Sequence, residues 1–180
     1  MRKKPPKKFK GSKPARTRAT GLQKSILNTL KYRQLFDCPM TSFELWQYLI
    51  GGSVPSPALF QKELAELVKS GKVICRENFY ALHKLDLDKI RQKRKRAERM
   101  QERAKQICRY LEPIPWIELA AITGSVAAHN AEENCDIDIL IVTKPGRLYL
   151  SRLFLVPILK LLGVYWTKQK PAGTICPNIM

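Results

Sequence analysis

The sequence lacks the residue patterns of several common metal and disulfide sites. Its 180 residues include only two histidines, and its five cysteines are scattered, with no Cys-x-x-Cys pair among them. An odd, scattered set of cysteines argues against a disulfide framework and against a structural zinc site, and it is typical of proteins in a reducing compartment. We therefore expect a cytoplasmic protein without a histidine-rich metal site.

Long uncharged apolar runs are also missing. The N-terminal region has no apolar segment of the kind found in signal peptides. The apolar stretch Leu148–Tyr165 is interrupted by Arg152, Pro157 and Lys160. This stretch favours a buried or interfacial helix over a membrane span, and we do not expect a membrane as a partner. Attachment of Leu148–Leu162 to a membrane surface is an alternative.

Acidic residues are scarce. The chain has 15 Asp and Glu against 33 Lys and Arg, which gives a net charge of +18 and predicts a polyanionic partner such as nucleic acid. Residues 1–20 hold nine of the basic residues and no acid, so about half of the net charge lies there. We expect residues 1–21, rich in Lys and Pro, to form a disordered basic tail. The tail either contacts RNA or DNA or only adds solubility.

Residues 22–83 contain three helical patterns followed by two strand patterns. Thr41 and Glu44 have the spacing of a capping box at the start of the second helix. Residues 72–75 and 79–82 predict two short strands. Three helices followed by a hairpin resemble a winged-helix domain, a fold that often places its third helix in the major groove of DNA.

The predicted third helix is not typical of a DNA reader, because the charges on its exposed face cancel. These charges belong to Lys62, Glu63, Glu66 and Lys69. A helix that reads the groove is normally basic, so a docking or positioning module is the preferred interpretation. On the second helix, the side chains expected to be buried are those of Phe43, Trp46, Leu49 and Ile50.

Residues 84–113 predict a basic linker helix with a thin apolar stripe. The stripe includes Ile90, Ala97 and Ala104, each seven residues from the next. A cluster of four basic residues could contact phosphates of a nucleic acid, or could simply lie on a solvated helix between two domains. This cluster consists of Lys93, Arg94, Lys95 and Arg96.

Residues 114–180 predict a second domain in which strands and helices alternate. We expect a strand at Trp116–Ile122, then a short helix at Ser125–Ala131, then a strand at Ile137–Val142 that is buried on both faces. A helix should follow from Arg147 to about Gly163, kinked or split by Pro157. The last expected elements are a strand at Gly163–Thr167 and a loop.

A glycine-serine turn and two aspartates stand out within this domain. Thr123-Gly124-Ser125 is separated from Asp136-Ile137-Asp138 by ten residues. Side chains alternate along a strand, so Asp136 and Asp138 share one face. The backbone N–H groups and the hydroxyl of Gly124-Ser125 suit an anion. Two acids on an apolar strand are costly without a metal or a partner, which favours a metal-nucleotide site over an ordinary strand-turn-helix unit.

This motif resembles the signature of nucleotidyltransferases of the DNA polymerase beta-like superfamily, and is closest to the minimal members. The resemblance implies an α+β chain in which the winged-helix-like domain precedes an α/β domain with a mixed sheet. It implies that Asp136 and Asp138 are catalytic and hold Mg²⁺, while Gly124 and Ser125 bind the NTP. Lys144 and Arg147 are further candidates for contacts with the nucleotide.

One departure from the family pattern concerns the metal site. Members of the superfamily usually place a third carboxylate on a later strand, but no Asp or Glu follows Asp138. Either the chain is a truncated version of a longer protein, or the domain binds nucleotide without efficient transfer. The alternative function is a non-enzymatic nucleic-acid-binding protein whose nucleotidyltransferase-like domain is vestigial.

Overall fold

The structure, a computed structural model, describes residues 21–51, 55–167, 169 and 172–180. The chain divides into two compact units between His83 and Lys84. In the described residues each unit combines helices with a three-stranded β-sheet, so the predicted α+β class is confirmed. The predicted basic tail, residues 1–21, lies outside the described residues except for Gly21, which begins the first helix.

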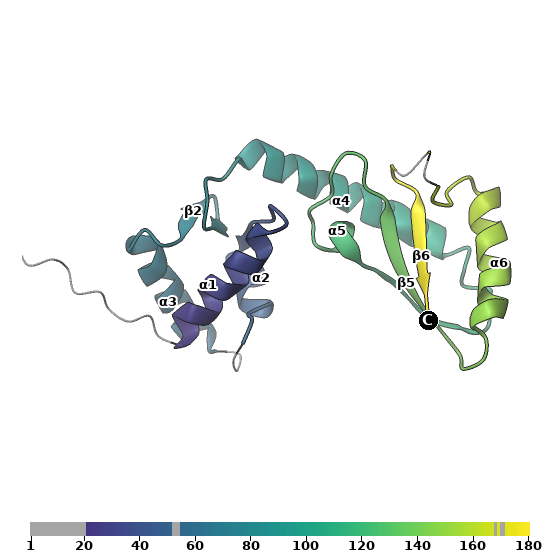
Figure 1. Cartoon of the computed structure of the whole chain (residues 1–180), viewed down its shortest axis with the longest axis horizontal. Helices are drawn as coiled ribbons and strands as arrows, with labels where there is room; N and C mark the ends of the chain where they lie inside the picture. Colours follow the sequence, from purple (N-terminus) through teal and green to yellow (C-terminus); the bar gives the residue numbers. More distant parts are fainter. Residues whose placement is uncertain (1–20, 52–54, 168, 170–171) are drawn as a thin grey trace, which may run out of the picture. The chain divides into compact units, whose positions relative to one another are not determined.

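The first unit consists of three helices and a small antiparallel sheet. Its elements are α1 (Gly21–Gln34), β1 (Met40–Thr41), α2 (Ser42–Gln47), α3 (Pro57–Lys69), β2 (Ile74–Arg76) and β3 (Phe79–Ala81). The strand order is β1-β3-β2, so β1, which precedes α2, pairs with the β3 strand of the hairpin. Figure 1 shows this unit with its three helices and β2 labelled. Buried side chains of α1 and α3, including Ile26, Phe60 and Leu64, form the core of this unit.

The second helix confirms its predicted start but not its predicted buried face. The Thr41 hydroxyl accepts from the Glu44 N–H, and the Glu44 carboxylate accepts from the Thr41 N–H at 2.7 Å, which completes the capping box. Leu45 is fully buried, whereas Phe43 and Ile50 are exposed. The predicted stripe is wrong at Ile50 because α2 ends at Gln47, before the helical pattern could reach it.

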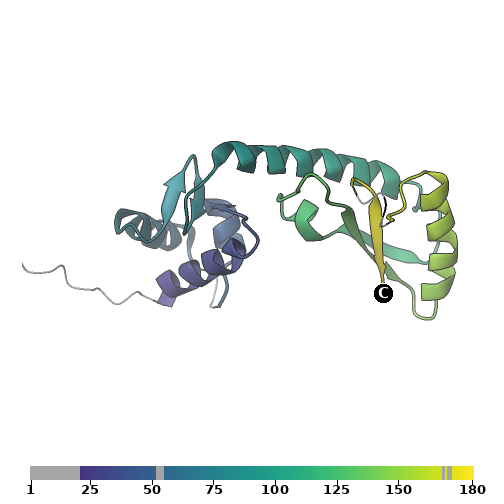
Figure 2. The same cartoon turned by 45° about the horizontal axis from the view of Figure 1, so that its top comes forward.

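The second unit consists of a mixed sheet and three helices. Its elements are α4 (Leu87–Cys108), β4 (Ile117–Ile122), α5 (Gly124–Ala127), β5 (Ile137–Thr143), α6 (Leu148–Leu161) and β6 (Ile175–Ile179). The predicted linker segment 84–113 contains α4, whose N-terminus is capped by Asp86. Its buried residues Ala97, Met100 and Ala104 lie in the same core as the sheet, so α4 is part of this unit's fold (Figure 2).

The strand order of this sheet is β4-β5-β6, with β5 antiparallel to β4 and parallel to β6. The sheet is therefore mixed, as predicted. The connection between parallel strands passes through α6, because parallel neighbours need a crossover. The predicted strand at Gly163–Thr167 is wrong: within it, Tyr165 forms an isolated bridge to Ile175, and the regular strand is β6, in the segment expected to be a loop.

The central strand β5 has two different faces. Ile137, Ile139 and Ile141 are 0% exposed, whereas the alternating residues are only half-buried, so the prediction of burial on both faces is wrong. The reason is that α4 and α6 both contribute to one core, the one that contains the three isoleucines. We call the side of the sheet with these isoleucines the covered face, and the side with Asp138 the open face.

Helix α6 is continuous through Pro157, so the predicted split is absent. It buries Ser151, Leu155 and Leu159 and leaves Tyr149 and Leu161 exposed. No helix in the described part of the chain is long and apolar enough to cross a membrane.

Candidate metal centre

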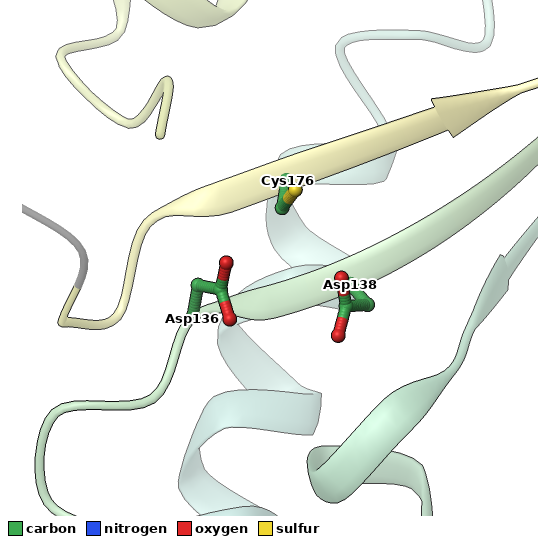
Figure 3. A group of neighbouring side chains, drawn as sticks. All are labelled: Asp136, Asp138 and Cys176. Carbon is green, nitrogen blue, oxygen red and sulfur yellow. The ribbon is translucent and has the colours of Figure 1, made fainter. Parts of the chain in front are cut away.

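Asp136 and Asp138 lie at the start of β5. Asp138 is the second residue of β5, and Asp136 is the residue directly before the strand begins. Because side chains alternate along a strand, both carboxylates belong to the open face, opposite the buried Ile137 (Figure 3). Both are half-buried, and within the described residues neither has an ion-pair partner. Two neighbouring carboxylates that no described basic side chain pairs with are a suitable site for a metal ion.

Cys176 of β6 is the third member of this group. It is paired in register with Asp138 across the parallel ladder, so the two side chains lie on the same face. One ligand atom from each of Asp136, Asp138 and Cys176 lies within 4.8 Å of the others (Figure 3). Cys176 was not among the residues predicted for the site, because its segment was predicted to be a loop. Alternation of apolar and polar residues in Ile175–Ile179 was the available signal, and Pro177 obscured it.

Asp138 is held through its side chain by β6 and through its backbone by the residue that follows β4. Asn178 of β6 donates its side-chain N–H to Asp138 Oδ1 at 3.4 Å. On the other side, the backbone N–H of Thr123 donates to the Asp138 carbonyl at 2.8 Å. The end of β4 is thus tied to the beginning of β5, and the glycine-serine turn that follows β4 is brought to the aspartates.

Gly124 lies directly against the Asp138 carboxylate. Its φ of +66° is in the left-handed region, and a Cβ at this position would be 2.4 Å from Asp138 Oδ2. Both the backbone conformation and the close approach therefore require glycine. The absence of a side chain lets the backbone of the turn and the Asp138 carboxylate come together. A site that binds a phosphate next to a metal needs such an approach.

Ser125 follows in the first turn of α5. The pKa of Cys135 is raised, mainly by burial, and the neighbouring Ser125 side chain opposes this shift without cancelling it. Burial also raises the pKa of Cys176, and the charges of Asp136 and Asp138 raise it further. The Cys176 thiol therefore keeps its proton unless a cation offsets the two carboxylates.

Lys144 and Arg147, predicted to contact the nucleotide, are not brought to the aspartates. Lys144 follows the last residue of β5, and Arg147 precedes α6. Six residues of extended strand at about 3.3 Å each separate Asp138 from Lys144 by roughly 20 Å. Both basic side chains are exposed at the opposite end of the sheet. The structure therefore brings Gly124 to Asp138, with Ser125 next to it in the chain, and leaves Lys144 and Arg147 near the other end of β5.

The four basic residues of α4 do not form a uniform surface. Lys93 is 4% exposed, and its ammonium is 2.6 Å from a carboxylate oxygen of Glu132. Arg96 donates to the Ala131 carbonyl at 2.9 Å and pairs with Glu133. These two side chains tie α4 to the loop before β5 instead of extending into solvent. Lys95 remains exposed, and Arg94 is half-buried.

A hollow of about 550 Å³ lies beside these ion pairs. It is lined by Lys89, Gln92, Lys93, Arg96, Glu132, Glu133, Asn134 and Cys135. Its basic and acidic side chains are already paired with one another in part, which favours a structural role for the charges over recognition of a phosphate.

The donor set of the candidate centre fits a divalent cation. Carboxylate oxygens are ligands for Mg²⁺, and a thiolate is a ligand for softer metals.

Comparison with protein-family models, curated proteins and solved structures finds no match for this chain.

Proposed function

We propose that the second unit is a nucleotidyltransferase domain of the DNA polymerase beta-like type. It transfers a nucleoside monophosphate from an NTP to a hydroxyl group of an acceptor. The observation that supports this most strongly is the close packing of Gly124 against Asp138, beside Asp136. This arrangement joins a phosphate-binding turn to a pair of metal-binding carboxylates, which are the two components that the reaction needs.

Gly124 and Ser125 bind the triphosphate. The glycine has no side chain to keep the phosphates from the backbone, and the serine supplies an N–H and a hydroxyl at the start of a helical turn. The triphosphate then lies next to the carboxylate that packs against Gly124. Lys144 and Arg147 have no part in this contact, since they lie at the far end of β5.

Asp136 and Asp138 hold Mg²⁺. When bound, the metal offsets the charge that develops on the transferring phosphate. The hydrogen bond from Asn178 orients one oxygen of Asp138, and the close approach of Gly124 fixes the position of the other. The protein therefore contributes mainly preorganised binding and positioning, which is the usual contribution of proteins to phosphoryl transfer.

The acceptor approaches from the open face. Its hydroxyl oxygen forms a bond to the α-phosphorus while the bond from that phosphorus to the bridging oxygen breaks, and pyrophosphate leaves. The hydroxyl proton passes to water, because no carboxylate is present on β6 to accept it. We expect slow transfer for this reason: general-base assistance typically contributes about 10²–10⁴-fold.

The proposal is tested by incubating the protein with α-labelled NTPs, Mg²⁺ and pooled acceptors that include RNA, DNA and protein. Label should be incorporated by the wild type and lost in Asp136→Ala/Asp138→Ala. Glu118→Gln, which removes an exposed acid from β4, is the matched control and should incorporate label normally. Equal incorporation by the wild type and the double variant would exclude the two aspartates from the reaction.

The alternative function is binding of nucleic acid without catalysis. It is favoured by the net charge of +18 and by the first unit, whose three helices and hairpin are arranged in the order of a winged helix. The outer residues of α3 weaken it, because Lys62 and Lys69 are offset by Glu63 and Glu66. Binding to RNA or DNA should then fall steeply as salt increases. Affinity that does not change with salt would contradict this alternative.

A further inference from the structure

The third position of the candidate centre holds a thiol where the resemblance leads one to expect a carboxylate. Cys176 lies on β6, directly beside Asp138 in the register of the sheet. Its sulfur and one oxygen from each aspartate lie within 4.8 Å of one another. Metal–oxygen and metal–sulfur bonds of about 2.0 and 2.3 Å put two ligands of one cation no more than about 4.3 Å apart, so small rotations of these side chains bring all three atoms to the same cation.

Neighbouring groups fix the positions of Asp138 and Cys176 relative to each other. Asp138 is restrained by Asn178 and by Gly124, and the ladder between β5 and β6 keeps Cys176 in register with it. The neighbouring residues of β6, Ile175 and Pro177, pair with Ile137 and Ile139 of the covered face. Cys176 therefore points to the open face for the same reason that Asp138 does.

A thiolate changes which metals this group prefers. Mg²⁺ takes oxygen ligands and keeps much of its water, whereas Zn²⁺ and Co²⁺ bind sulfur well. We propose that Asp136, Asp138 and Cys176 together bind a thiophilic divalent cation, Zn²⁺ or Co²⁺, more tightly than Mg²⁺. This inference rests on the metal site of the proposed function, but it does not depend on nucleotide transfer.

Coordination by Cys176 has a consequence for the proposed reaction. As the metal–sulfur bond forms, the thiol proton leaves to water, and no electron is transferred. The cation then occupies the carboxylates that Mg²⁺ needs. Low concentrations of Zn²⁺ should therefore inhibit transfer supported by Mg²⁺, and Cys176→Ser should relieve the inhibition.

The test uses Co²⁺ as an optical probe of the full-length protein. Cobalt bound to a thiolate gives a charge-transfer absorption in the near ultraviolet, whereas cobalt bound only to carboxylates and water does not. The absorption should appear in the wild type and in Cys108→Ser, a matched control on α4, and should be absent in Cys176→Ser. Zn²⁺ affinity, measured by competition with a chelator, should fall by more than about tenfold in Cys176→Ser, since even outer-shell changes can have this effect.

Three results would overturn the inference. They are the absence of the charge-transfer absorption in the wild type, its persistence in Cys176→Ser, and its persistence in Asp136→Asn/Asp138→Asn. Thermal melts of each variant without metal establish that the protein is folded. Transfer with Mg²⁺ but no cobalt–thiolate signal contradicts the inference and leaves the proposed function intact. A cobalt–thiolate signal without nucleotide transfer supports the inference and contradicts the proposed function.

Discussion

The two faces of the sheet in the second unit have different roles, although they alternate along the same strand. The covered face presents Ile137, Ile139 and Ile141, which are 0% exposed in a core shared with α4 and α6. The open face presents Asp136 and Asp138 beside Cys176 and the glycine-serine turn. Substitutions on the covered face should therefore affect stability, and those on the open face should affect chemistry.

The largest effect is expected for Asp138→Asn. Removal of one of two metal-binding carboxylates should reduce transfer by more than about 100-fold, because even outer-shell changes around a metal cost about 10–100-fold. The free energy of unfolding should stay the same or rise, since repulsion between two close carboxylates is removed. Initial rates of label incorporation and urea unfolding measure the two quantities. A large loss of stability together with activity would mean that the faces are not independent.

The reverse is expected for Ile139→Ala on the covered face. Deletion of a fully buried aliphatic side chain should lower the free energy of unfolding by about 2–5 kcal/mol. Below the unfolding transition, binding of Co²⁺ to the open face should change little. Urea unfolding monitored by tryptophan fluorescence measures the free energy of unfolding, and titration with Co²⁺ measures the affinity of the open face for the metal. An unchanged unfolding midpoint would contradict the packing of the covered face.

Gly124→Ala tests the contact between the turn and Asp138, and Gly163→Ala is its control. Both glycines have φ of +66°, but a Cβ at Gly163 would meet nothing within 4 Å, whereas one at Gly124 would meet Asp138 Oδ2 at 2.4 Å. The shared backbone penalty should be about 1–2 kcal/mol. Gly124→Ala should be destabilised beyond that value, and the excess should disappear in the Asp138→Ala background. Equal penalties at the two glycines would show that the close approach is absent.

The smallest effect is expected for Lys144→Ala and Arg147→Ala. The backbone of Lys144 is roughly 20 Å along the strand from Asp138 and Arg147 follows in the next turn, whereas charges act over about 8 Å in physiological salt. Each change should alter the KM for NTP by less than about threefold. A tenfold increase in KM would place one of these residues at the nucleotide and contradict the separation of the two ends of β5.

The sequence was sufficient to predict the parts of the site that depend on local patterns. Alternation along a strand placed Asp136 and Asp138 on one face, and the turn after a strand placed Gly124 and Ser125 near a helix start. The α+β class and the mixed sheet were predicted correctly as well. These inferences succeed because each depends on neighbours within one or two elements.

The remaining features depend on contacts that no local pattern contains. Cys176 follows Asp138 by 38 residues and reaches it only through the α6 crossover and the parallel register of β6. Lys144 is close to Asp138 in sequence but distant in space, because an extended strand separates them. The half-exposed state of the open face was also missed, because an apolar run does not reveal that α4 and α6 pack in a core on the opposite face.

The most direct test of the metal-nucleotide site is calorimetry with NTP analogues that carry a methylene group between the α- and β-phosphates. These analogues cannot be turned over, so the measurement reports binding alone. We expect binding by the wild type with Mg²⁺, a loss of more than about tenfold in affinity without Mg²⁺, and a similar loss in Asp136→Asn/Asp138→Asn. Equal affinity in the wild type and the double variant, with or without Mg²⁺, would contradict a metal-nucleotide site at Asp136 and Asp138.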